Sequence, residues 1–318
     1  MPSDLHRKDK ALFTLRDLKE WKPPAVTRII QGGILNLQGK MVIFGGEGTW
    51  KSMVAQHLAH HLARGTDWLG FHTSLCNVIK VQVELPQYED RERMLKYIEG
   101  SRRVYLARHL PLQPTSDQLA YHNKQAEEYA SPTNMVYRTS QFLHIDESSG
   151  FESLKKNIIL TQTEMPDLPL VLILDPLYKM FNRDLSSGED ISALINKFDV
   201  AMEELNFTTV IVAHSRKTQM DEEGNPQNLG SQDISGSRHL ANWVDTIIRI
   251  DAGKGDETNT RFDFTFTKHR TAHIVIPRIT VKWDTHTLHP IIINRKLPVD
   301  YKVDEGEIRD DYDFSHLD

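Results

Sequence analysis

The chain is organised around one stretch, Gly45-Gly46-Glu47-Gly48-Thr49-Trp50-Lys51-Ser52. The apolar run 41–44 precedes it, and a segment with helical apolar spacing, 53–64, follows it. A strand, a glycine-rich turn, Lys-Ser and a helix are the layout of a phosphate-binding loop. Glycines let backbone N–H groups close around phosphate oxygens, and the start of the helix adds its dipole and unpaired donors. We therefore expect residues 45–52 to bind a nucleotide, with Lys51 on the β- and γ-phosphates and Ser52 offering its hydroxyl to Mg²⁺.

One position departs from the usual pattern G-x-x-x-x-G-K-[ST]. The residue before the lysine should be glycine, which permits an unusual or close backbone approach, and here it is Trp50. The bland alternative is a chance glycine-rich turn before a helix. If the loop does bind phosphate, Trp50 either packs on the loop or stacks near the nucleotide, and the sequence leaves its effect on affinity open.

Composition limits the class of protein. The chain has 318 residues and a formal net charge of −6, so the molecule as a whole is not a basic nucleic-acid binder, although a local basic surface remains possible. Its single cysteine, Cys76, excludes an intramolecular disulfide and a cysteine-based zinc cluster. No apolar run approaches the length of a membrane span, and the polar start does not suit a signal peptide, so we expect a cytoplasmic protein without membrane contact.

Three apolar runs end in a polar side chain. They are the predicted strands 78–84, 170–175 and 208–214, which end in Glu84, Asp175 and His214. Open α/β sheets build their sites at the carboxyl ends of strands. We expect Glu84 to orient or deprotonate an attacking water, Asp175 to hold Mg²⁺ directly or through water, and His214 to sense the γ-phosphate. The alternative for each is an ordinary polar residue at a strand end.

The remaining pattern predicts an α/β domain with flanking arms. We expect an arm at 1–25, one ATPase domain over 26–295 and an acidic, disordered tail at 296–318, which either binds a protein partner or is merely solvated. The region 99–137 is the hardest to interpret. Further expected elements are a short helix in the arm at 12–21, a hairpin at 27–37, helices at 90–97, 117–129, 151–163, 190–205 and 235–243, and strands at 141–145, 245–250, 262–267, 274–283 and 288–293.

With these motifs in order, the chain resembles the RecA-like ATPases of the AAA_25 and RepA type, relatives of DnaB-like hexameric helicases and of the RadA and KaiC groups. The resemblance spans roughly residues 25–295. It rests on the phosphate loop and on segments similar to family motifs: RGTDWLG at 64–70, the strand 81–84, LDP with its flanks at 172–176, VAHSRK at 212–217, DISGS at 233–237 and TKHR at 267–270. Two positions depart from the family: Ser215 replaces a histidine, and an arginine is displaced to Arg238.

The resemblance implies roles for further residues. Lys268 and Arg270 would reach the γ-phosphate of an adjacent subunit, and two residues apart on a strand they would point to the same side. The loops 217–232 and 233–238 would face a central channel, where Ser235, Ser237 and Arg238 would contact the backbone of single-stranded DNA. These roles require a homo-oligomer, either a hexameric ring or a filament.

The sequence thus predicts a RecA-like P-loop NTPase core, with a twisted, mostly parallel sheet flanked by helices and antiparallel strands at its C-terminal end. The expected function is that of an ATP- and Mg²⁺-dependent motor on single-stranded DNA, a RepA-like replicative helicase. Two alternatives remain: a RecA- or RadA-like recombination or regulatory ATPase that does not unwind DNA, and a nucleotide-binding module that Trp50 has deprived of turnover.

Overall fold

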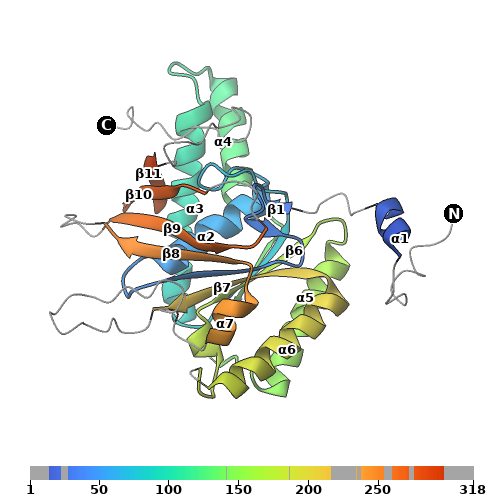
Figure 1. The fold of residues 1–318 in the computed structure, drawn as a ribbon. Coiled ribbons are helices and arrows are strands. Elements are labelled where there is room, and N and C mark those ends of the chain that lie inside the picture. The colour runs from blue at the N-terminus through green and yellow to red at the C-terminus, as the bar shows by residue number, and fades with distance from the viewer. Residues whose placement is uncertain are drawn as a thin grey trace.

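A large twisted sheet forms the centre of the protein, with helices on both faces (Figure 1). The computed structural model describes residues 14–22, 28–140, 142–185, 187–215, 234, 238–253, 260–271 and 276–296. Within these ranges the sheet has nine strands, in the order β11-β10-β9-β8-β3-β7-β6-β4-β5. The strands are β3 (Lys40–Gly45), β4 (Asn77–Gln82), β5 (Met135–Thr139), β6 (Leu170–Asp175), β7 (Phe207–His214), β8 (Thr246–Ala252), β9 (Arg261–His269), β10 (Arg278–Asp284) and β11 (His289–Lys296).

The sheet has a parallel part and an antiparallel part. The six strands from β8 to β5 run parallel to one another, while β9, β10 and β11 are added to β8 in antiparallel pairs. The parallel strands are almost continuous apolar runs, because helices cover both of their faces. This confirms the expected fold class, a mostly parallel sheet with antiparallel strands at the C-terminal end.

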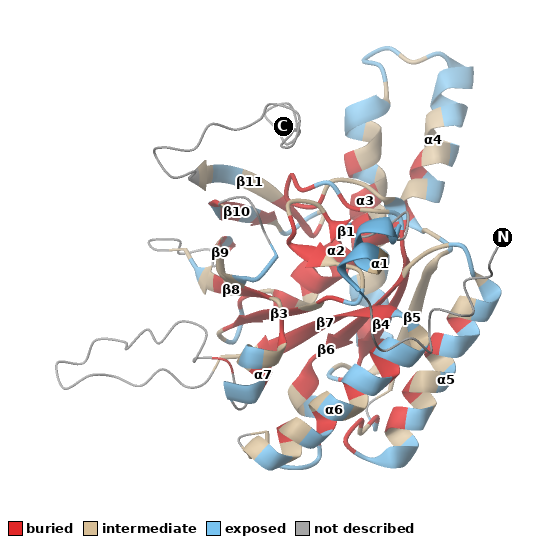
Figure 2. Ribbon diagram, turned by 45° about the vertical axis from the view of Figure 1, so that its right-hand side comes forward, coloured by how far each residue is buried: buried red, intermediate tan, exposed pale blue. Residues whose placement is uncertain are grey.

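Helices cover the two faces of the sheet in separate groups. Alternate residues of β3 divide between them: Met41 and Ile43 join one apolar core with α2, whereas Val42 and Phe44 join the other with α5, α6 and α7. Figure 2 shows that the buried residues are concentrated in the sheet and in α2. The helices are α1 (Leu15–Glu20), α2 (Lys51–Arg64), α3 (Gln87–His109), α4 (Ser116–Ala130), α5 (Ser148–Glu164), α6 (Gly188–Leu205) and α7 (Arg238–Trp243), with a 3₁₀ turn, η2 (Leu177–Met180).

The pair α3–α4 projects from the body of the domain and differs from the sequence prediction (Figures 1 and 2). A helix was expected only over 90–97, but α3 runs for 23 residues. Beyond Val104 it has no buried side chain, and ion pairs from Glu99 to Arg102 and Arg103 along its surface contribute instead. An apolar stripe was therefore missing where the helix continues. Gly100 permits a close approach, because a Cβ there would lie 1.9 Å from the carbonyl oxygen of Thr287.

Two predicted strands need correction. The strand expected at 141–145 is wrong: the chain pairs at β5 instead, and Leu143 and Ile145 are buried in a non-strand segment, where Ile145 N–H donates to the Met180 carbonyl. Apolar residues there fill the core without joining the sheet. The strand expected to reach Glu84 ends at Gln82, so Glu84 lies in the following turn.

Several shorter elements agree with expectation. The hairpin is formed by β1 (Arg28–Ile30) and β2 (Leu35–Asn36), and Gly65 ends α2 with a φ of 61°. The predicted arm contains α1, which has no buried residue. Most of that arm, the loop 217–232, Ser235, Ser237 and the acidic tail lie outside the described residues. Across the described ranges, no helix combines the length and apolar character that crossing a membrane requires.

Candidate active site

A pocket of about 320 Å³ lies at the carboxyl ends of the parallel strands. Of the residues expected from sequence to bind or hydrolyse a nucleotide within one chain, all but Gly45 and Gly46 line it: Glu47, Gly48, Thr49, Trp50, Lys51, Ser52, Glu84, Asp175 and His214. They come together because β3, β7 and β6 are neighbours in the sheet, and β4 lies next to β6. The volume falls in the range that small-molecule sites occupy.

The loop between β3 and α2 has the backbone geometry that the glycines predicted. A Cβ on Gly45 would lie 2.4 Å from the Ile250 carbonyl oxygen on β8, so only glycine fits there. Gly48 has a φ of 74°, and Thr49 Oγ1 closes the turn by donating to the Gly46 carbonyl at 2.8 Å. The Lys51 ammonium also donates to the Gly46 carbonyl. Burial lowers the pKa of Lys51, against the opposing effect of Asp175, Glu84 and Glu47.

Trp50 takes the backbone conformation that the missing glycine would take. Its φ is 56° and its ψ is 23°, in the left-handed region, and it is the residue immediately before α2. Its ring packs on Trp283 of β10, with ring centroids 5.6 Å apart. The tryptophan thus neither distorts the loop nor folds back over it, because its side chain is held by the antiparallel extension of the sheet.

Ser52 and Asp175 are in direct contact, as a magnesium site of this kind needs. Ser52 Oγ donates to Asp175 Oδ1 at 2.9 Å, which leaves the serine lone pairs directed elsewhere. Among the residues described, no group of three or more His, Cys, Asp and Glu side chains could hold a metal alone. The donor set therefore fits Mg²⁺ that is shared with nucleotide phosphates, the usual arrangement for this ion.

Behind Asp175 lies a buried lysine that sequence analysis did not single out. Lys80, in the middle of β4, is 2% exposed, and its Nζ lies 3.1 Å from Asp175 Oδ2. The same nitrogen donates to the Tyr137 hydroxyl at 2.8 Å, and that hydroxyl donates to Gln56 Oε1 at 3.0 Å. Burial alone would lower the pKa of Lys80, but Tyr137 and Asp175 outweigh it and raise the pKa above its ordinary value. The available signal was a lysine inside a strand that is otherwise buried on both faces.

Glu84 and His214 share a second partner that was missed, Tyr178 of η2. The Tyr178 hydroxyl donates to Glu84 Oε1 at 3.0 Å, and its ring meets His214 edge-on, with centroids 4.8 Å apart. Burial, followed by the nearby Glu84 carboxylate, raises the pKa of Tyr178 to about 12, so it stays protonated and can donate. Burial, followed by Lys51, lowers the pKa of His214. The imidazole is therefore neutral at neutral pH and can act by hydrogen bonding.

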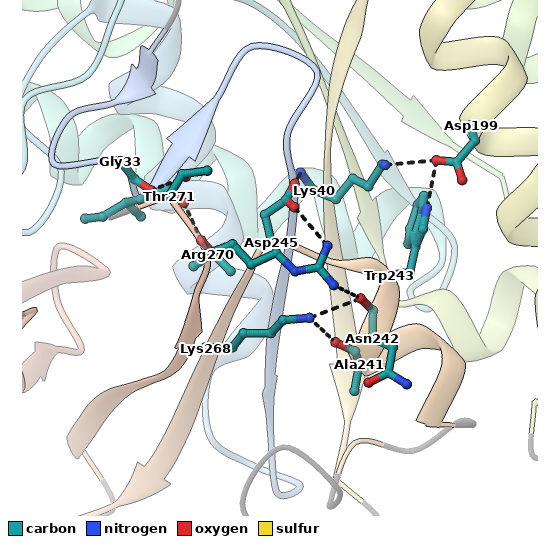
Figure 3. A network of polar contacts seen from close by, with 12 residues as sticks. Gly33, Lys40, Asp199, Ala241, Asn242, Trp243, Asp245, Lys268, Arg270 and Thr271 are labelled. Carbon is teal, nitrogen blue, oxygen red and sulfur yellow. Dashed lines mark hydrogen bonds and ion pairs between the residues drawn. The ribbon is translucent and has the colours of Figure 1, made fainter. Parts of the chain in front are cut away.

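Lys268 and Arg270 do not line this pocket. Figure 3 shows both side chains directed at the end of α7, where Lys268 Nζ donates to the carbonyls of Ala241 and Asn242, and Arg270 donates to that of Asn242. Arg270 also lies 3.6 Å from the Asp245 carboxylate. Cations suit a helix C-terminus, where the last carbonyls lack partners. Within one chain, the pair thus caps α7.

Of the residues expected to contact DNA, only Arg238 is described. It is exposed, at the first position of α7, the helix that Lys268 and Arg270 cap. One further cation lines the pocket: Arg93, an exposed residue of α3 that sequence analysis did not single out.

Comparisons with known proteins agree with this geometry. The family model AAA_25, described as an AAA domain, matches residues 2–220. Among solved structures, an ATPase domain solved by itself is similar with a TM-score of 0.59 and 13% identity, covering 85% of this chain and 94% of that one. A DnaB-like replicative helicase, from a structure that also concerns its interactions with primase, gives 0.60 and 13%, covering 89% and 67%. At such identities the likeness shows a common fold. No curated protein matches the sequence.

Proposed function

Since the chain belongs to the AAA_25 family of RecA-like P-loop ATPases, we propose that it hydrolyses Mg·ATP to drive movement on single-stranded DNA, as a RepA-like replicative helicase does. The observation that carries the ATPase part is the convergence of Lys51, Ser52, Glu84, Asp175 and His214 on one pocket. Phosphoryl transfer depends mainly on positioning and electrostatic stabilisation, and these five side chains offer both.

Each residue has a distinct task in this proposal. Lys51 leaves the Gly46 carbonyl and binds phosphate oxygens, while Ser52 and Asp175 hold Mg²⁺, the latter through water. The metal, when bound, neutralises charge that develops on the phosphates. Glu84, oriented by the Tyr178 hydroxyl, accepts the proton of the attacking water, and neutral His214 hydrogen-bonds the γ-phosphate.

The DNA-acting part rests on the family and on the basic pair. We propose that the active form is a hexameric ring or a filament, in which Lys268 and Arg270 complete the site of the neighbouring subunit. Ser235, Ser237 and Arg238 would then contact the DNA backbone, and binding should weaken with salt. The acidic segment 304–318 is proposed as a binding site for a protein partner, and a cytoplasmic location suits all these roles.

The test is the steady-state ATPase rate with and without single-stranded DNA. Wild-type protein should hydrolyse ATP and be stimulated by DNA, whereas Lys51→Ala should lose at least about 100-fold in turnover, as expected when a phosphate-stabilising group is removed. The matched control is Lys124→Ala, which removes an exposed lysine of α4. Full turnover in Lys51→Ala would contradict the site assignment.

Two alternatives predict other outcomes in the same assay. A recombination or regulatory ATPase would show DNA-stimulated hydrolysis, but no unwinding of a forked duplex. A nucleotide-binding module would bind ATP without turnover, with or without DNA. Because Trp50 holds the backbone in the glycine-like conformation, we favour turnover over the silent module.

A further inference from the structure

The buried ion pair behind the pocket asks for an explanation that the proposed reaction does not supply. Lys80 and Asp175 are almost fully buried, at 2% and 1% side-chain exposure. Taking two charges out of water is costly, and such pairs often contribute little to stability compared with apolar side chains of the same size. Apolar side chains fill most of the parallel strands around Lys80, so a charge here suggests a task at the neighbouring site.

The pair lies directly under the phosphate-binding loop. Lys80 is opposite Tyr137 in the β4–β5 register, and Gln56 of α2 completes the row. Asp175 itself lines the pocket, whereas Lys80 lies one layer behind it. Ser52 holds Oδ1 and Lys80 faces Oδ2, so the orientation of the carboxylate is fixed from both sides. Residues that hold a metal ligand from behind tune how that ligand acts.

Charge balance gives the consequence. A nucleotide brings several negative charges to a pocket that already contains Asp175, Glu84 and Glu47. Mg²⁺ normally relieves the repulsion between the phosphates and such an aspartate. Lys80 supplies a permanent positive charge 3.1 Å from that aspartate, whether or not a metal is bound. In the low dielectric of a buried site, this neutralisation is strong.

We propose that Lys80 is an internal counter-charge for Asp175 that lowers the Mg²⁺ requirement of nucleotide binding. The inference rests on the proposed nucleotide site and concerns binding, not turnover. Lys80 is a positioning residue, because it touches the carboxylate and not the nucleotide.

The experiment compares ADP affinity, measured by calorimetry, in Mg²⁺ and in EDTA. The ratio of the two dissociation constants should be under about tenfold for the wild type and should rise at least about tenfold further in Lys80→Met, which keeps the length of the side chain and removes its charge. Tyr137→Phe is the matched control: it removes a partner of Lys80 but not the charge, so the ratio should stay within about twofold while the melting temperature falls.

The outcomes separate this inference from the proposed function. An unchanged ratio in Lys80→Met would overturn it, as would an equal rise in Tyr137→Phe, since the effect would then come from packing. If Lys80→Met does not fold, Asp175→Asn is compared with Lys80→Met/Asp175→Asn, in which no buried charge is left alone. The double variant should bind ADP about tenfold more weakly in EDTA, and equal affinities would contradict the proposal. Failure of the wild type to bind ADP even with Mg²⁺ would instead reject the nucleotide site.

Discussion

The charged side chains of the pocket and those of the basic pair are held in different ways. In the pocket, Ser52, Asp175 and Glu84 contact one another's supporting groups and face a common hollow. Lys268 and Arg270 instead donate to carbonyls at the end of α7 (Figure 3). The pocket is therefore assembled within one chain, whereas the pair must exchange backbone carbonyls for phosphate oxygens before it can serve another chain. That exchange would remove the cap of α7, the helix that begins at Arg238.

The largest effect that could break this comparison is expected for Arg270→Ala. If Arg270 completes a neighbour's site, hydrolysis should fall by at least about 100-fold while ATP binding changes little, because the pocket itself is intact. Mixing this variant with Glu84→Gln should restore part of the activity, since hybrid interfaces would contain one complete site. The measurement is ATPase rate against mixing ratio.

The control for Arg270→Ala is Arg103→Ala, which removes an exposed arginine of α3. It should leave the rate unchanged. Because Arg270 also caps α7, the melting temperature of each variant is needed alongside the rate. An absence of rescue at every ratio, with the fold preserved, would mean that the pair serves only as a helix cap.

The sequence predicted one side of this comparison better than the other. The strands β3, β6 and β7 were located to within two residues, because strands buried on both faces are unbroken apolar runs. Their order in the sheet then brings Lys51, Asp175 and His214 together, as the rule for strand ends predicts. Spacing also predicted that Lys268 and Arg270 share a side, but not that α7 would take up their donors.

What could not be predicted depends on distant contacts between polar residues. Lys80, Tyr137 and Gln56 belong to three elements, and no local pattern relates them. The edge strand β5 carries only half-buried residues, so it lacked the apolar signal that 141–145 displayed. The far half of α3 is similarly polar. Hydrophobic periodicity reports burial against a core, and it is silent where charges and single hydrogen bonds define the structure.

Acid should distinguish the two regions by a second route. The α2 side contains four buried histidines, His57, His60, His61 and His289, and burial is the main cause of the lowered pKa of each. His60, whose Nε2 lies 2.8 Å from the Tyr129 carbonyl oxygen, has its pKa lowered from 6.5 to about 3. Between these values the unfolded chain binds a proton that the folded chain does not, so stability is lost as the pH falls below 6.5.

The expected loss from His60 is about 2 kcal/mol between pH 7 and pH 5, and the other three histidines add to it. His60→Gln keeps a donor for the Tyr129 carbonyl but does not titrate. It should therefore lose about 2 kcal/mol less than the wild type over the same interval, whatever its stability at pH 7. Urea unfolding at the two pH values measures this difference. Equal losses would show that His60 is protonated in the folded state.

The smallest expected effect concerns Trp50, where the phosphate loop meets the antiparallel extension. Two opposing effects meet in this residue: a left-handed backbone that side chains disfavour, and a ring that packs on Trp283. Trp50→Ala removes the ring and keeps the backbone cost, whereas Trp50→Gly removes both. Because the two variants lack the same contact, their difference isolates the backbone conformation, and Trp50→Gly should be the more stable by about 1 kcal/mol. Urea unfolding without nucleotide measures it. If the alanine variant were equally stable, the loop would not hold this left-handed conformation in solution, and the phosphate-binding geometry would have to form only when the nucleotide binds.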